Sequence, residues 1–270
     1  MRLLLHTRFS VDYPNKPGVL RDVELEMGEG EILGLVGESG SGKSTIALAL
    51  LRLLDHKGGR VAGEILFDGR DLLQLRPREM RDIRGREIAL VLQSPVASLN
   101  PALRIGTQIA EAWRAHNSEF KLWKERALEL FDLVSLPADE GFLDRYPRQL
   151  SVGQAQRVLI AMAILHRPRL LIADESTSAL DAITQSEILA LFRRLNRELN
   201  MAMLFISHDL LSVASICQRI AILQNGRIIE CGSTEQMFRE PRTEDTRALL
   251  QAVLRNSVAA AELVAEVEQG

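Results

Sequence analysis

Residues 37–44 read Gly-Glu-Ser-Gly-Ser-Gly-Lys-Ser, which matches the pattern G-x-x-x-x-G-K-[ST] at every fixed position. The octapeptide follows the apolar run EILGLV at 31–36 and precedes TIALALLRLL at 45–54, which has the composition of a helix. A strand, a glycine-rich loop and a helix in this order are the context that the pattern requires. Glycines let successive backbone N–H groups turn toward an anion, and the start of the helix adds its partial positive charge. This stretch therefore predicts a loop that binds the phosphates of a nucleoside triphosphate.

Three side chains at the end of this loop have expected roles on the bound triphosphate. Lys43 is placed to reach the β- and γ-phosphates, and the Ser44 hydroxyl is placed to ligate Mg²⁺. Thr45 lies within reach of the α-phosphate. A chance match is the alternative, since such a pattern arises on the order of once in a hundred chains of this length. The strand before the loop and the helix after it weaken that alternative.

A second candidate element is the apolar run Leu170–Ala173, followed directly by Asp174 and Glu175. The run predicts a buried strand, and ligands of open α/β sheets bind beyond the carboxyl ends of such strands. We expect Asp174 to hold Mg²⁺, directly or through water, and Glu175 to orient or deprotonate an attacking water. An Asp-Glu pair that is merely solvated at a strand exit is the alternative, but it would leave the metal site of the phosphate loop incomplete.

Composition and charge exclude several classes of protein. The 270 residues are 46% hydrophobic, 26% charged and 4% aromatic, unlike disordered, collagen-like or disulfide-rich chains. The formal net charge of -3 provides no bulk attraction to nucleic acid. The longest strictly apolar run, 158–165, is far shorter than the roughly 20 residues that span a bilayer. Cys217 and Cys231 lack a metal-ligand spacing. We expect a cytosolic chain that neither spans a membrane nor binds nucleic acid.

Apolar runs alternate with helical segments, which predicts a mostly parallel α/β core. Strands are expected at 23–27, 31–36, 61–67, 87–92, 170–173, 202–206, 220–223 and 228–231, the last two forming a hairpin at Asn225-Gly226. Helices are expected at 45–54, 122–133, 155–165 and 183–199. The segment 102–165 has little strand signal, so we interpret it as a helical insertion between two core strands. The end of the chain, 245–270, is interpreted as a helix that frays into a tail.

The order of motifs resembles that of the ATP-binding cassette (ABC) ATPases over nearly the whole chain. In chain order, the residues that carry the resemblance are Gly37–Ser44 (Walker A), Gln93 (Q-loop), LSVGQ at 150–154 (signature), Leu170–Glu175 (Walker B), SALD at 178–181 (D-loop) and His208 (H-loop). The resemblance implies a P-loop NTPase (RecA-like) α/β core with a mostly parallel sheet, an N-terminal antiparallel β subdomain and an inserted α-helical subdomain. It divides a single ABC ATPase domain, 1–270, into three parts. These are 1–101 with 166–235 as core and β subdomain, 102–165 as the helical subdomain, and 236–270 as a C-terminal helical extension.

The resemblance also implies roles that spacing alone does not assign. Tyr13 would stack on adenine, although a tyrosine beside a proline is otherwise ordinary turn surface. Gln93 would contact Mg²⁺ and the attacking water, and His208 would hydrogen-bond the γ-phosphate. Because family members bind ATP between two subunits, the signature would face ATP on a partner's Walker A. The residues expected to contact nucleotide are Tyr13, Gly37, Glu38, Ser39, Gly40, Ser41, Gly42, Lys43, Ser44, Thr45, Ser151, Gly153, Gln154 and Asp181; the expected catalytic residues are Gln93, Glu175 and His208, and the expected metal ligands are Ser44, Gln93 and Asp174.

Two positions depart from the family pattern. Val152 stands where the signature LSGGQ has glycine, and a β-branched residue disfavours positive φ. We therefore expect the backbone at Val152 to be helical. Ser176 stands where the family usually has proline, which loosens the turn after Glu175 but leaves both carboxylates in place.

Within the family, the chain most resembles the ATPases of oligopeptide, dipeptide and nickel importers. Gln93-Ser94-Pro95 and the run SLNP at 98–101 resemble the branch's pattern Q-x-P-x-x-S-L-N-P, and the match at 238–250 is partial. The branch implies a peripheral ATPase on the cytoplasmic face of the inner (cell) membrane that uses ATP and Mg²⁺. The implied partners are a second ABC ATPase subunit (the same or paralogous), separate transmembrane permease subunits and an extracytoplasmic solute-binding protein. No cysteine follows Cys231, so no iron–sulfur cluster is expected.

Two other functions stay open at this point. One is a cassette ATPase of a soluble or non-transport complex, because carbon–phosphorus lyase complexes contain subunits that resemble the same branch. The other is a regulatory cassette that binds ATP without turnover. The intact Gln93, Glu175 and His208 argue against the regulatory cassette.

Overall fold

Two sheets form the framework of the computed structural model, which describes residues 2–116 and 122–251. The larger sheet has six strands in the order β10-β9-β3-β8-β7-β6. Its strands are β3 (Ile32–Val36), β6 (Ile88–Val91), β7 (Leu170–Asp174), β8 (Ala202–Ser207), β9 (Arg219–Gln224) and β10 (Arg227–Ser233). All neighbours pair in parallel except β9 and β10, which form an antiparallel hairpin. Asn225 and Gly226 both have positive φ in the turn, so the hairpin predicted from this dipeptide is confirmed.

The smaller sheet is antiparallel, in the order β2-β1-β4-β5. It consists of β1 (Leu3–Tyr13), β2 (Lys16–Gly28), β4 (Arg60–Phe67) and β5 (Arg70–Asp71). Sequence patterns did not predict β1, since no expected strand begins before residue 23. The strand alternates as expected for a half-buried sheet, but one inward position is the fully buried Thr7. Its hydroxyl is bonded to the backbone of β2, accepting from the Leu25 N–H at 3.2 Å.

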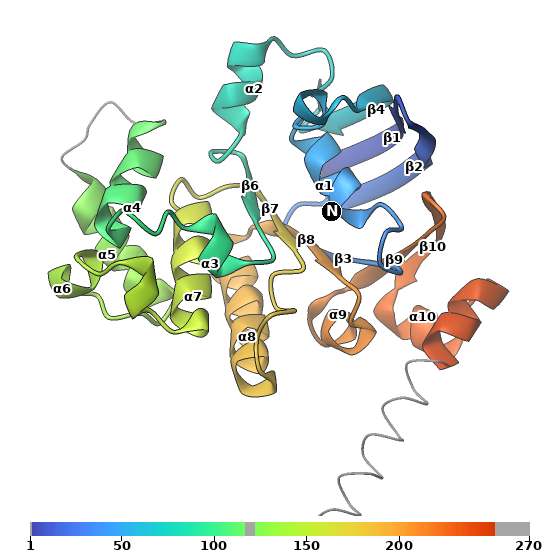
Figure 1. Ribbon diagram of the computed structural model, residues 1–270. Helices are drawn as coiled ribbons and strands as arrows, with labels where there is room; N and C mark the ends of the chain where they lie inside the picture. The colour runs from blue at the N-terminus through green and yellow to red at the C-terminus, as the bar shows by residue number, and fades with distance from the viewer. Residues whose placement is uncertain (1, 117–121, 252–270) are drawn as a thin grey trace, which may run out of the picture.

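Ten labelled α-helices surround the sheets in the described residues, and a further helix covers 244–251. They are α1 (Lys43–Leu50), α2 (Pro77–Ile83), α3 (Pro95–Ser98), α4 (Ile105–Arg114), α5 (Trp123–Leu133), α6 (Glu140–Leu143), α7 (Val152–Ala163), α8 (Ala182–Leu199), α9 (Leu210–Ile216) and α10 (Thr234–Arg239). Helices α4 to α7 gather at one side of the larger sheet, and the antiparallel sheet lies toward the other (Figure 1). The described residues between β6 and β7 contain helices and no strand, as the sequence predicted for the insertion. The exact division into subdomains stays a prediction.

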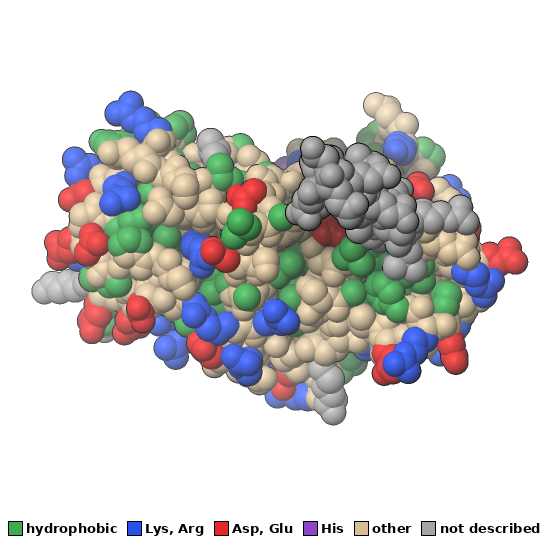
Figure 2. All heavy atoms as spheres, turned by 90° about the horizontal axis from the view of Figure 1, so that it is seen from below, with side chains coloured by type: hydrophobic (Ala, Val, Ile, Leu, Met, Phe, Trp, Pro, Cys, Tyr) green, Lys and Arg blue, Asp and Glu red, His purple; other side chains and the backbone are tan. Residues whose placement is uncertain are grey.

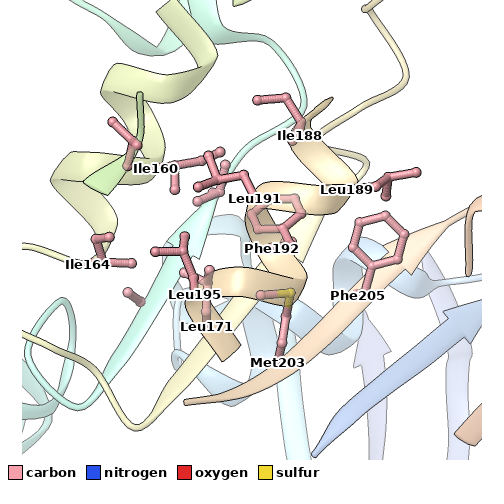
Figure 3. Packing of buried hydrophobic residues seen from close by; sticks show 14 of the residues in the cluster. Ile160, Ile164, Leu171, Ile188, Leu189, Leu191, Phe192, Leu195, Met203 and Phe205 are labelled. Carbon is pink, nitrogen blue, oxygen red and sulfur yellow. The ribbon is translucent and has the colours of Figure 1, made fainter. Parts of the chain in front are cut away.

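The larger sheet is buried on both faces because its strands alternate between two apolar clusters. Ile32 and Val36 of β3 pack into one cluster, while Leu33 and Leu35 pack into the other. The first cluster includes inward side chains of α7 and α8 over β7 and β8 (Figure 3). Continuous apolar runs are typical of parallel strands covered on both faces, which explains why the sequence located these strands.

A buried carboxylate anchors the C-terminal segment to β10. The Glu230 side chain accepts hydrogen bonds from the backbone N–H groups of Arg242 and Thr243 at 3.0 and 3.1 Å. Burial by itself raises the pKa of Glu230, but these and further hydrogen bonds lower it to about 2. A helix follows at 244–251, and the rest of the predicted tail, 252–270, lies outside the described residues.

None of the helices in the described residues combines the length and the apolar character needed to cross a membrane. On the face shown in Figure 2, Lys and Arg side chains are interspersed with Asp and Glu side chains. This mixture agrees with the small net charge.

The core predicts one large stability effect. Phe205 of β8 is fully buried and meets Phe192 of α8 edge to face, with ring centroids 6.0 Å apart. Phe205→Ala should lower the free energy of unfolding by about 3–5 kcal/mol, because it leaves a cavity between the sheet and α8. Leu3→Ala, at a side chain that is 51% exposed, is the control and should change it by less than about 0.5 kcal/mol. Urea unfolding monitored by circular dichroism measures both, and equal effects would contradict this account of the core.

Candidate nucleotide-binding site

The loop Gly37–Ser44 connects β3 to α1 and adopts a conformation that requires glycine. Gly42 has φ 111°, and a Cβ there would lie 2.6 Å from Cδ2 of Leu20. A Cβ on Gly37 would lie 2.2 Å from the carbonyl oxygen of Leu223. Helix α1 begins at Lys43, two residues earlier than predicted, and ends at Leu50 rather than residue 54. The loop therefore leads directly into a helix N-terminus, where backbone N–H groups are free to bind an anion.

Lys43 turns its ammonium group back over the loop. Its Nζ donates to the carbonyl oxygens of Gly37 at 2.8 Å and Glu38 at 2.9 Å. Nζ also lies 3.8 Å from Oε1 of Glu175. Burial lowers the pKa of Lys43, and the carboxylates of Glu175 and Asp174 partly oppose that shift. The side chain is a buried cation that an anionic ligand at this position would stabilise.

Asp174 at the end of β7 has the properties of a metal ligand. The residue is buried, and its Oδ1 has no hydrogen-bond partner among the described residues. Burial raises the pKa of Asp174, and a hydrogen bond from the Ser44 side chain opposes this shift. An orphaned carboxylate oxygen beside a hydroxyl offers the hard oxygen ligands that Mg²⁺ prefers. The described residues hold no cluster of three or more His, Cys, Asp or Glu side chains suited to a metal. The donor set thus fits an ion held by one or two protein oxygens and by substrate phosphates.

Glu175 lies at the centre of the predicted catalytic residues. Its Oε2 accepts a hydrogen bond from Nε2 of Gln93 at 3.0 Å, and its Oε1 lies 3.6 Å from Nδ1 of His208. Glu175 has φ 47°, in the left-handed region, and its N–H donates to the carbonyl oxygen of Ile206 in β8 at 2.9 Å. A non-glycine residue in this region marks a position where surrounding structure imposes the conformation. The structure therefore brings Gln93, Lys43 and His208 together around the carboxylate.

The predicted signature residues form a second, separate group. Ser151 caps α7, accepting from the Gln154 N–H at 3.1 Å, and the Gln154 side chain accepts from the Ser151 N–H at 3.1 Å. These two hydrogen bonds form a reciprocal capping box, and Ser151 and Val152 are exposed at the start of α7. Val152 is the first residue of α7, so its predicted helical backbone is confirmed, and its side chain is 44% exposed.

Asp181 caps the next helix of this group and adjoins the signature. Its Oδ1 accepts from the N–H groups of Ile183 and Thr184, at 3.1 and 3.0 Å. The hydrogen bond from the Thr184 N–H is the main reason that the pKa of Asp181 is lowered. A Cβ on Gly153 would lie 2.8 Å from Cγ2 of Thr184, so the two helix starts touch. Within the described residues, neither Asp181 nor Ser151 bonds to the phosphate loop or to Glu175.

Tyr13 is the predicted nucleotide contact with the least structural support. It ends β1, and its ring lies beside Gly59, where a Cβ would be 3.1 Å from Cε1 of Tyr13. No hydrogen bond joins it to the described phosphate loop. Stacking on adenine stays a prediction.

Sequence reasoning missed Ser178 as a member of the site. Its Oγ accepts from Gln93 Nε2 at 3.2 Å and donates to the carbonyl oxygen of Glu175 at 2.9 Å. The SALD peptide contained this residue, but no role was assigned to it. Serine three residues after a strand-end acid is typical of a local turn in which the hydroxyl bonds the backbone, and that signal could have identified it.

Comparisons with known proteins agree with this arrangement. The model of the ABC transporter family matches residues 20–178. The dipeptide transport ATP-binding protein DppD of Haemophilus influenzae is 43% identical over 257 residues, which cover 94% of this chain and 78% of that protein. The oligopeptide transport ATP-binding protein OppD of Bacillus subtilis is 41% identical over 243 residues, covering 89% and 68%.

A solved structure shares the fold. It is the dimeric, post-hydrolysis state of an ATP-binding cassette bound to ADP and Pi. It matches with a TM-score of 0.71 and 28% sequence identity, covering 86% of this chain and 98% of that one. The P-loop NTPase core with an antiparallel β subdomain and inserted helices is thereby confirmed. Family model, relatives and fold agree, and the chain belongs to the ABC transporter family.

Proposed function

We propose that this chain is the ATP-hydrolysing subunit that powers an importer of peptides or of similar small solutes. The main support is the arrangement around Glu175, where the side chains of Gln93, Lys43 and His208 converge. Beside them lies the Asp174 oxygen that has no hydrogen-bond partner among the described residues. The relatives, which are named as dipeptide and oligopeptide transport ATP-binding proteins, support the importer. They favour peptides over nickel, and they favour an importer over a soluble complex of the carbon–phosphorus lyase kind.

Each residue of the site has a separate proposed role in phosphoryl transfer. The backbone of Gly37–Ser44 would cradle the phosphates, and Lys43 would exchange its two carbonyl partners for phosphate oxygens. Asp174 and Ser44, with Gln93, would hold Mg²⁺, which neutralises charge on the phosphates. Glu175 would accept a proton from the attacking water, and Gln93 and His208 would orient the reactants around it. Positioning and electrostatics supply most of the catalysis in such a reaction.

A dimer is proposed because the predicted contacts of ATP lie in two groups that do not meet within one chain. Ser151 caps α7 and Asp181 caps α8, and within the described residues neither side chain bonds to the phosphate loop of its own chain. Two copies arranged head to tail would place each signature helix against ATP on the other copy's phosphate loop. The dimeric state of the solved cassette supports this arrangement.

We further propose that the chain works at the cytoplasmic face of the cell membrane, bound to separate permease subunits. The partner ATPase is either identical or paralogous, and an extracytoplasmic solute-binding protein delivers the solute. Closure of the two ATPases on ATP would drive the permease, and hydrolysis would reopen them. The support is the resemblance to import ATPases over most of the chain.

Glu175→Gln is expected to preserve ATP binding and to abolish turnover, trapping a closed dimer. The amide keeps the size of the side chain but cannot accept the proton of the attacking water. ATPase assays and size-exclusion chromatography with ATP and Mg²⁺ measure the two effects. Lys43→Ala is the contrasting variant and should lose nucleotide affinity instead. Hydrolysis by Glu175→Gln above roughly a tenth of the wild-type rate would remove Glu175 from the proposed role.

Val152→Gly is expected to change the ATPase rate by less than about tenfold, because the helical backbone at Val152 does not need glycine. Steady-state ATP hydrolysis at saturating ATP measures it. A larger gain in rate would mean that valine weakens this half of the nucleotide site.

The importer itself is tested by affinity purification of tagged Glu175→Gln with ATP and Mg²⁺. Detergent-solubilised native membranes and cytosol are processed in parallel, and bound proteins are identified by mass spectrometry. We expect a multi-spanning permease from the membrane fraction, with the second ATPase. Recovery of soluble enzymes alone would contradict the importer and favour a soluble complex.

A further inference from the structure

We propose that Gln185 is a positioning residue for His208, acting through a hydrogen bond to the side chain of Asp209. Gln185 lies in the first turn of α8, and Asp209 directly follows His208. The Nε2 atom of Gln185 donates to Oδ2 of Asp209 at 3.2 Å and to Oγ of Ser212 at 2.8 Å. The inference rests on the proposed ATPase function, in which His208 acts on the γ-phosphate.

His208 needs support from its backbone because little else holds the imidazole. The side chain is 57% exposed, so packing restrains it weakly. Its Nδ1 lies 3.6 Å from Oε1 of Glu175, which is longer than a hydrogen bond. The position of the imidazole therefore depends on where the loop between β8 and α9 places residue 208.

Asp209 fixes that loop with both of its carboxylate oxygens and its N–H group. The N–H donates to Oγ of Ser207 at 3.0 Å, and Oδ1 accepts from the N–H of Leu211 at 3.0 Å, which caps α9. Oδ2 accepts from the hydroxyl of Ser212 as well as from Gln185. The contacts with Ser207, Leu211 and Ser212 are local and would move with the loop.

Gln185 makes the contact that is not local. Among the described residues, it is the one hydrogen-bond partner of the Asp209 carboxylate that lies outside the β8–α9 segment. It belongs to a long helix whose inward side chains, including Phe192 and Leu195, are fully buried against the sheet (Figure 3). The bond thus ties the loop that carries His208 to a rigid element of the core.

The same turn of α8 also contacts the signature helix. Oγ1 of Thr184 donates to Oδ2 of Asp181 at 2.7 Å, which fixes the Thr184 side chain. Its methyl group then occupies the space beside Gly153. Gln185 therefore sets His208 in a fixed relation to the signature of its own chain.

Gln185→Met tests the proposal, because methionine keeps the length of the side chain and removes both N–H donors. The full chain is assayed at a concentration at which it hydrolyses ATP, together with any subunits that co-purify. We expect kcat to fall about five- to tenfold, the size expected for losing one or two positioning hydrogen bonds. The KM for ATP should stay within about twofold, because Gln185 does not face the phosphate loop.

A double-mutant cycle separates positioning of His208 from a structural role. In a His208→Ala background, measured by single-turnover hydrolysis, Gln185→Met should cost less than about twofold further. Gln236→Met is the matched control, since Gln236 of α10 also makes side-chain hydrogen bonds but lies far along the chain from the site. It should leave kcat unchanged. If Gln185→Met does not fold, Asp209→Asn replaces an acceptor by a donor at the same bond and should reproduce the loss of kcat.

Three results would overturn the inference. They are a kcat of Gln185→Met within about twofold of wild type, an undiminished loss in the His208→Ala background, or an equal loss in Gln236→Met. Each of them requires a wild-type chain that turns over ATP. A wild-type chain that binds ATP and never hydrolyses it would instead contradict the proposed function.

Discussion

The carboxyl ends of four parallel strands meet at one edge of the buried sheet, and the candidate site depends on this alignment. Strands β3, β6, β7 and β8 are each followed within two residues by a part of the site, at Gly37, Gln93, Glu175 and His208. A slip of one residue in any strand would move its side chains from one apolar cluster to the other, where they would not fit the close packing, so the core fixes the register. Apolar burial thereby holds Gln93 and Glu175 in contact although 82 residues separate them.

Burial of charged side chains at this edge of the sheet also favours the binding of charged ligands. Lys43 and Asp174 are both buried, and desolvation moves their pKa values in opposite directions, each toward the neutral form. The ion pair between Nζ of Lys43 and Oε1 of Glu175 is long, at 3.8 Å, and Oδ1 of Asp174 has no hydrogen-bond partner among the described residues. A phosphate chain with its divalent cation brings an anion to Lys43 and a cation to Asp174. Charges that cost free energy when buried would therefore become favourable when the phosphates and the cation bind.

Much of the framework could be predicted from the sequence, for a physical reason that also sets the limit. Continuous apolar runs located β3, β7 and β8, because strands covered on both faces leave no polar alternation to confuse the pattern. Strand β1 was missed because Thr7 occupies a core position, where its hydroxyl is bonded to β2. That hydrogen bond exists only once the two strands have paired.

The candidate site shows the same limit, because residues at strand ends could be predicted from the sequence and their hydrogen-bond partners could not. Motif spacing identified Asp174 and Glu175, since strand ends deliver residues to the site whatever their partners are. The partners themselves, such as Ser178 on Gln93 or Gln185 on Asp209, depend on how separate elements pack. No periodicity in a single sequence records such a contact.

The first turn of α8 gives the two halves of the nucleotide site a common support within one chain. It is capped by Asp181, touches the signature at Gly153 through Thr184, and holds the loop of His208 through Gln185. These contacts span three consecutive helical segments, and α8 itself is packed against the sheet over its buried face. A shift of α8 relative to β8 would change both contacts together. In a dimer of the proposed kind, the signature would contact the partner's nucleotide, and His208 would contact the nucleotide of its own chain. The first turn of α8 would therefore link these two contacts.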